Sequence, residues 1–213
     1  MPISRRLLQA SALGLALLLA VPNVLAQESE LFSLKNRWEH VTTQTPPDDQ
    51  VDALAALASE AEALAQQYPN DARILTWQGI VLASQASAEG GLGALGLAKD
   101  ARAALERAIA IDPRGNNASA YVTLGALYAR APGWPIAFGD SETAEAMFQK
   151  ALEIRPQGID VNYYYASFLA EEGRTAQAIE HARRAVEGQV REGREASDEA
   201  RRDDARALLE SLE

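Results

Sequence analysis

The chain contains no cysteine and two histidines, His40 and His181. Without cysteine there can be no disulfide, no thiolate nucleophile, no zinc site built on cysteine ligands and no lipid anchor on an N-terminal cysteine. The histidines lack the H-E-x-x-H spacing of metalloproteases, and no G-x-S-x-G motif is present. The sequence therefore predicts no catalytic site, no metal site and no cofactor, and favours a protein that is not an enzyme.

Basic residues are scarce, because 20 Lys and Arg face 30 Asp and Glu, which gives a formal net charge of −10. Loss of the N-terminal leader described below removes Arg5 and Arg6 and leaves 18 basic residues against 30 acidic ones, a net charge of −12. Nucleic acids and anionic membrane surfaces repel a chain of this charge before contact. Nucleic acid is therefore not an expected partner.

A long apolar run occurs at the N-terminus, from Leu7 to Val21, directly after Arg5 and Arg6. A basic start, an apolar centre and a small residue such as Ala26 at the end are typical of a secretory signal peptide. The run is shorter than the ~20 residues that span a bilayer, which disfavours an uncleaved anchor. Residues 1–26 are therefore predicted to be a signal peptide cleaved after Ala26, and the mature protein to be periplasmic.

Alternation with period two is absent over any useful length, whereas Ala, Leu, Glu and Arg recur at helical spacing almost throughout. The sequence therefore predicts an all-α fold. Alignment of the chain against itself reveals a repeat: Ala144, Phe148, Ala151 and Pro156 have the spacing of Ala101, Leu105, Ala108 and Pro113. In such a repeat the small residues let two helices approach closely, and the proline ends the second helix of a pair.

These positions resemble the tetratricopeptide repeat (TPR) over residues 70–188. The resemblance implies a TPR-like helix-pair solenoid of about three repeats, a class of fold that binds other molecules more often than it transforms them. Residues 27–69 are expected to form N-terminal capping helices, and residues 189–213 a C-terminal capping helix with a charged outer face.

The first two repeats exceed the ~34-residue period, with insertions near 88–98 and 131–139. Insertions at one end of stacked helix pairs map to one face of the solenoid, often the binding face. Gly91–Gly96 satisfies the G-x-G-x-x-G pattern, but a helix is expected before it instead of a strand, which disfavours nucleotide binding. The remaining interpretations are a flexible glycine-rich loop and a mobile apolar flap carrying Leu92 and Leu95.

The second insertion carries Trp134 and Phe138 in a backbone stiffened by prolines and turned by glycines. These two rings either fold back over the end of the solenoid or contact a ligand or partner, and both roles can coexist. Tyr128, just before the loop, and Tyr163 are further contact candidates. The repeat register places Tyr163 on the concave groove.

By the same register the groove carries Thr76, Ile80, Val122, Ala126, Tyr163 and Ser167, which are neutral and mostly apolar. A groove without lysine, arginine or asparagine does not clamp the terminal carboxylate of a peptide. We therefore expect an apolar ligand or the apolar face of a peptide.

A narrower pattern comprises Leu124-Gly125-Ala126-Leu127-Tyr128, Pro132-Gly133-Trp134-Pro135, Gly139-Asp140, Ala144, Phe148, Ala151-Leu152 and Asn162-Tyr163-Tyr164. It resembles the TatT-like proteins, the repeat-containing periplasmic component associated with tripartite ATP-independent (TRAP) transporters. The resemblance covers mainly residues 115–172. It implies an exported helical protein that can form homo-oligomers, partner a transporter substrate-binding protein and hold apolar small molecules in a cavity. The chain departs from the lipoprotein members of that group, because it lacks their lipidated cysteine.

The sequence thus favours an exported, non-catalytic binding protein for an apolar small molecule or a transport-system partner in the periplasm. The expected contact residues are Trp134, Phe138, Tyr163, Tyr128, Leu92 and Leu95. The alternative is a protein–protein interaction scaffold for envelope complex assembly, in which the same surface grips a polypeptide. An enzyme would need a cluster of polar groups in three dimensions that the linear sequence does not reveal.

Overall fold

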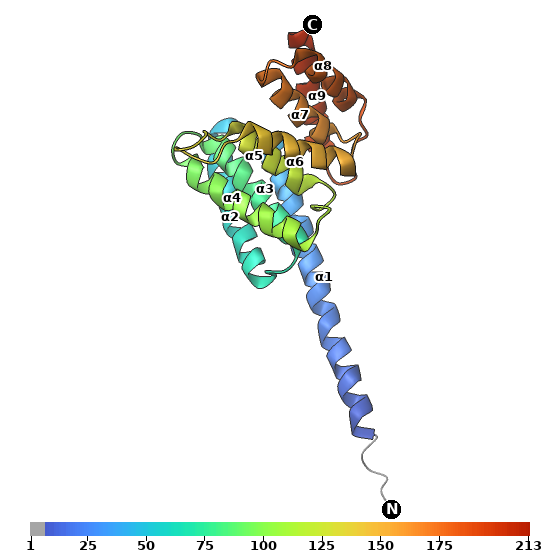
Figure 1. The fold of residues 1–213 in the computed structure, drawn as a ribbon. Helices are drawn as coiled ribbons and strands as arrows, with labels where there is room; N and C mark the ends of the chain where they lie inside the picture. The colour runs from blue at the N-terminus through green and yellow to red at the C-terminus, as the bar shows by residue number, and fades with distance from the viewer. Residues whose placement is uncertain (1–6) are drawn as a thin grey trace, which may run out of the picture.

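The computed structural model describes the backbone of residues 7–213 and the side chains of residues 25–213. The regular elements within that range are all helices (Figure 1). In chain order they are α1 (Leu7–Gln44), α2 (Pro47–Gln67), α3 (Ala72–Glu89), α4 (Ala94–Ile111), α5 (Ser119–Arg130), α6 (Ser141–Ile154), α7 (Ile159–Glu171), α8 (Thr175–Glu187) and α9 (Glu195–Leu212). The predicted all-α, TPR-like solenoid is confirmed, with α3–α4, α5–α6 and α7–α8 as helix pairs.

The predicted signal peptide falls largely outside this description, because residues 1–6 and the side chains up to residue 24 are not part of it. The backbone of the apolar run belongs to α1, whose first half projects away from the other helices (Figure 1). Gln27 is the first described residue of α1 whose side chain makes a hydrogen bond outside that helix, and it donates to the Asp71 carboxylate. Glu28 follows, with an ion pair of 2.6 Å to Arg73. No helix in the described part of the chain has the length and apolarity of a membrane span.

The repeat positions found in the sequence are the points where paired helices approach most closely. A Cβ added to Gly125 of α5 would lie 2.7 Å from a ring carbon of Phe148 on α6, closer than atoms pack. A Cβ on Gly79 of α3 would lie 2.4 Å from Leu105 on α4. Ala101 and Ala144, at corresponding positions of the second helices, are completely buried. Small residues therefore set the close spacing within each pair.

The insertion near 88–98 lengthens helices instead of forming a long loop. Helix α3 continues to Glu89 and α4 begins at Ala94, so only residues 90–93 form a turn. The expected apolar flap across this segment is therefore wrong in extent, because Leu95 belongs to α4. The physical reason is that Ala94, Leu95, Leu97 and Ala98 are good helix formers on either side of Gly96, and that Ala98 is buried against the core.

The insertion near 131–139 is a loop closed on itself by backbone hydrogen bonds. The Gly139 amide donates to the Pro132 carbonyl at 2.9 Å, and the Asp140 amide donates to the Tyr128 carbonyl at 3.0 Å. A Cβ on Gly139 would lie 1.8 Å from the carbonyl oxygen of Ala131. The two ends of the loop therefore approach so closely that only glycine fits at position 139. The loop is therefore a defined structure that presents its tip in a fixed position.

The two ends of the solenoid meet, because α1 contacts α9. The Ser197 amide, in the first turn of α9, donates to Glu39 Oε1 of α1 at 2.8 Å, where the helix dipole favours a negative charge. The Arg194 guanidinium lies 4.7 Å from the ring centroid of Trp38 and 5.0 Å from that of Trp77, within the range of cation–π attraction. The first described helix, α1, is therefore held against the last one, α9.

A buried ion network, made of Arg155, Asp160, Arg191 and Asp198, holds this closing segment on the repeats. Asp160 on α7 pairs with Arg155 and with Arg191, whose Nη2 lies 3.1 Å from Asp160 Oδ2. Arg191 Nε also donates to Asp198 Oδ2 of α9 at 2.9 Å. Burial alone would raise the pKa of Asp160, but the positive charges of Arg191 and Arg155 outweigh it and hold that pKa below its usual 3.8.

We expect Asp160→Asn to lower the free energy of unfolding by about 3–5 kcal/mol at neutral pH, because it leaves Arg155 and Arg191 buried without their shared counter-charge. Since the folded pKa is lowered, the contribution of the carboxylate is fully present above its unfolded pKa of about 3.9 and is lost as the pH falls through the folded value. The stabilities of the two proteins should therefore converge in acid. Urea unfolding at a series of pH values measures this.

The control is Asp203→Asn, since Asp203 makes an exposed ion pair with Arg206 on α9. Such a pair contributes at most about 1 kcal/mol. An Asp160→Asn variant as stable as the parent at neutral pH would contradict the stabilising role of the charged carboxylate.

Candidate functional site

A cavity of about 800 Å³ is lined by α1, α2, α3, α4, α5, α7 and the segment from Arg191 to Arg201. Pockets that bind small molecules commonly have about 300–1,000 Å³. Because helices from both ends of the chain contribute, the cavity depends on the contact between α1 and α9. We refer to it as the central cavity.

Most of the wall is made of apolar or small side chains from α2–α5, the turn at 90–93 and the 131–139 loop. The larger ones are Leu54, Ile80, Leu92, Leu95, Val122, Leu127 and Ile136, and alanines and serines of α3 lie between them. Leu92 and Ile136 are also 84% and 63% exposed, so they mark where the central cavity opens to solvent. The wall therefore offers extended apolar surface with an apolar rim.

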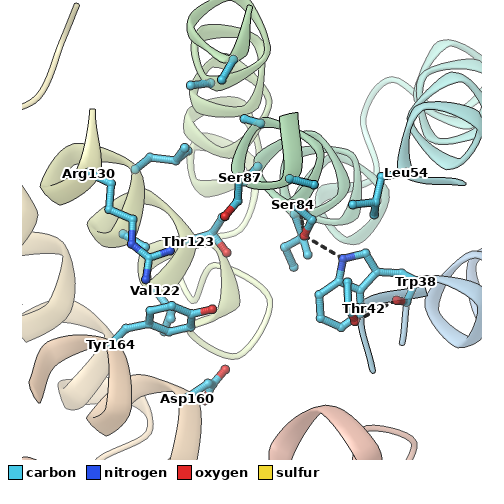
Figure 2. A pocket seen from close by; sticks show the side chains of 18 of the residues that line it. Trp38, Thr42, Leu54, Ser84, Ser87, Val122, Thr123, Arg130, Asp160 and Tyr164 are labelled. Atoms are coloured by element: carbon cyan, nitrogen blue, oxygen red, sulfur yellow. Dashed lines mark hydrogen bonds between the residues drawn. The ribbon is translucent and has the colours of Figure 1, made fainter. Parts of the chain in front are cut away.

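Trp38 of α1 turns its ring to the cavity with its polar atom satisfied. Its Nε1 donates to Ser84 Oγ of α3 at 2.9 Å, and Ser84 in turn donates to the Ile80 carbonyl at 2.9 Å (Figure 2). Across the cavity, Ser87 and Thr123 point toward one another from α3 and α5 (Figure 2). Hydroxyl groups are thus spread along an otherwise apolar wall.

The α9 side of the central cavity is charged. Its charged lining residues are Arg130, Arg191, Arg194, Arg201, Asp160 and Asp198. Four arginines against two aspartates leave an excess of two positive charges, inside a chain whose net charge is −10. Burial lowers the pKa of Arg194 to about 10, and the charge of Arg191 adds to the effect, so Arg194 is still protonated at neutral pH.

This charged side corrects the prediction of a neutral binding surface. Ile80, Val122 and Ala126 line the central cavity as predicted, whereas Thr76 is fully buried. The prediction considered only two positions on the first helix of each repeat. The arginines come from the end of α5 and from residues that follow the last repeat.

Tyr163 is a second correction, because Tyr164 lines the central cavity instead. Successive helical residues point 100° apart, so an error of one position moves a side chain off the groove. The Tyr163 ring packs at 5.1 Å on Tyr164 and at 5.5 Å from the Arg201 guanidinium. The Arg130 side chain extends over the Tyr164 ring, 5.5 Å from its centroid (Figure 2).

The other predicted contact residues separate into two groups. Leu92 and Leu95 line the central cavity. Phe138 packs edge-on against Tyr128 at 5.4 Å, so these two rings cover the end of a repeat. Trp134 does not fold back with them, because it is 89% exposed at the tip of the 131–139 loop. Trp38 and Arg194 were missed, since a capping helix was expected to supply packing alone.

Within the described residues, no three His, Asp or Glu side chains gather in a way that could hold a metal ion. The histidines lie apart: His181 bonds Asn162 at 2.8 Å and packs on Tyr165, and His40 bonds Gln44 at 3.1 Å. Each therefore has a local partner in the helix packing.

Residues 136–196 match the tetratricopeptide repeat family. The matched segment contains α6, α7 and α8, together with the loop that carries Arg191 and Arg194. No curated protein is significantly similar to the chain. Tetratricopeptide repeats generally mediate binding between proteins and are typically non-catalytic, so the second half of the chain contains a repeat of a binding type.

Proposed function

We propose that the protein is a non-catalytic binding protein that takes a largely apolar small molecule into the central cavity. The observation that carries the proposal is the combination of size and lining. The cavity has the volume of a ligand site, the larger lining residues outside its charged α9 side are mostly apolar, and isolated hydroxyl groups could orient a ligand. The resemblance of residues 115–172 to TatT-like proteins supports the same role.

The proposal includes export to the periplasm with removal of residues 1–26. Cleavage after Ala26 would leave Gln27 and Glu28 at the new N-terminus, and these are the residues through which α1 first bonds Asp71 and Arg73. The folded helices would therefore lose none of these contacts. Intact-protein mass spectrometry of the chain recovered from a periplasmic extract tests this. We expect a chain beginning at Gln27; recovery of the uncleaved chain alone would contradict export.

Ser87→Trp should block ligand binding, because Ser87 faces the central cavity from α3 and the indole would fill part of its volume (Figure 2). Native mass spectrometry of the parent protein should show a co-purified small molecule that the variant lacks. Titration with the neutral fluorescent probe N-phenyl-1-naphthylamine should show an affinity at least about tenfold lower in the variant, a loss of about 1.4 kcal/mol.

The matched control is Ser59→Trp, which adds the same side chain at an exposed position of α2 that does not line the cavity. It should retain the ligand and the probe. A parent protein that carries no small molecule and does not bind the probe would refute the proposal.

The second candidate is a scaffold that binds a protein partner, and Trp134 is the observation that favours it. The 131–139 loop is closed by backbone hydrogen bonds and holds this ring at 89% exposure. Exposed tryptophans are frequent anchors of protein interfaces. A transporter substrate-binding protein or a second copy of the chain is the partner that the TatT-like resemblance favours.

Photo-crosslinking in cells separates this candidate from the first. With benzoylphenylalanine in place of Trp134, we expect one dominant crosslinked polypeptide. The same group in place of Ile111, an exposed residue at the end of α4, should give none. Equal and diffuse labelling from both positions would exclude the Trp134 loop as a protein-binding surface.

A further inference from the structure

The positive charge on the α9 side of the central cavity is only partly compensated within the protein. Both lining carboxylates, Asp160 and Asp198, are bonded to Arg191, and Asp160 is also paired with Arg155 behind the wall. Arg201 pairs with Asp204 at 3.0 Å, on the next turn of α9. Among the ion pairs of the described residues, none includes Arg130 or Arg194.

Two of the arginines meet at one aromatic ring. The guanidinium of Arg130 lies 5.5 Å from the centroid of Tyr164, and that of Arg201 lies 5.8 Å from it. These side chains come from α5 and α9, on either side of α7. Two positive charges near the same ring repel each other, and an anion bound beside them would offset that charge.

Tyr164 adds a hydrogen-bond donor at this point. Its hydroxyl points into the central cavity (Figure 2), and no hydrogen bond of the described residues engages it. Its neighbour Tyr163 packs against Arg201 from outside the cavity lining. Arg130, Arg201 and the Tyr164 hydroxyl therefore bring hydrogen-bond donors to one ring in the cavity wall, and we call these three groups the arginine subsite.

Arg194 raises the positive potential near this subsite. Arg194 and Arg201 are seven residues apart, which places them two turns apart on one face of α9 and its N-terminal cap. Both line the central cavity, as do Ser197 and Asp198 between them. Trp38 and Trp77 hold the Arg194 guanidinium in place by ring contacts, and Arg194 makes no direct ion pair with a carboxylate of the described residues.

We propose that the ligand of the central cavity is an amphipathic anion, with a carboxylate or similar oxyanion headgroup bound at the arginine subsite. Its apolar body lies along Ile80, Val122 and Leu95 toward the rim at Leu92. The inference rests on the proposed function, because it assigns the headgroup of a ligand in the same cavity. Charge-assisted hydrogen bonds select an anion over a neutral molecule of the same shape.

Three probes that share a ten-carbon chain and differ in head charge test this: decanoate, decanol and decyltrimethylammonium. Isothermal titration calorimetry with protein expressed from the full chain, at neutral pH, measures each affinity. Decanoate should bind at least about tenfold more tightly than decanol, and decyltrimethylammonium should bind more weakly than both.

Arg130→Gln removes a charge that has no ion-pair partner among the described residues, so it breaks no ion pair of the fold. It should weaken decanoate about tenfold and leave decanol unchanged. Tyr164→Phe should weaken decanoate by a smaller factor. Arg183→Gln is the matched control, since it makes the same change of charge on the exposed side of α8, where Arg183 pairs with Glu213. It should leave all three affinities as they are.

The outcomes separate the inference from the proposed function. Equal binding of decanoate and decanol, or loss of decanoate binding in Arg183→Gln as large as in Arg130→Gln, would overturn the arginine subsite and leave the apolar cavity in place. Failure of all three probes to bind, or binding that persists in Ser87→Trp, would overturn both.

Discussion

The carboxylate of Asp160 is the constraint on which the closed shape of the molecule depends. It lies in the repeat helix α7 and is the counter-charge of Arg155 and Arg191, so it fixes the segment that leads into α9. That segment in turn positions Arg194 against Trp38 and Ser197 against Glu39. A buried charge of this kind is costly unless every partner is in place, and therefore favours one arrangement of the closing segment over looser ones.

The two walls of the central cavity follow from this closure. The repeats contribute close-packed helix pairs whose small and apolar residues leave a smooth surface, as at Ile80 and Val122. The closing segment contributes the charges, because the buried ion network already requires arginines there. The positive side is thus partly a by-product of how the solenoid is closed. Arg130 comes from α5 and takes no part in the network, so it is the lining charge that the closing segment does not account for.

The sequence predicted those features of the fold that depend on local spacing. The positions of Gly125, Phe148 and Ala144 identify a helix pair because the contact they make lies within one repeat. The 131–139 loop was also located, since prolines and glycines break helical spacing. The contact between α1 and α9 was not predictable in this way. It joins Glu39 to Ser197 across 158 positions, and neither residue belongs to a motif.

The same limit applies to the candidate site. Leu92 and Leu95 were identified because they lie in an insertion, whereas Trp38, Tyr164 and Arg194 become a site only when the ends of the chain meet. The charged C-terminal helix was interpreted as a solvated cap, the usual role for such composition. Composition cannot show which face of α9 is turned inward. Arg194 and Arg201 share the inward face because closure by Asp160 sets the rotation of that helix.

The contrast between the acidic chain and its positively charged cavity affects which ligands the cavity favours. A net charge of −10 repels anions at long range, but the ionic atmosphere screens that repulsion within about 8–10 Å at physiological salt. Beyond the rim at Leu92 and Ile136 an anion approaches Arg191, Arg194 and Arg201, which are partly buried and therefore less screened by water than surface charges. Small hydrophilic anions gain nothing from the apolar wall that leads inward. A molecule that combines an apolar body with a single negative charge gains from both walls, which is the chemistry that this arrangement of residues favours.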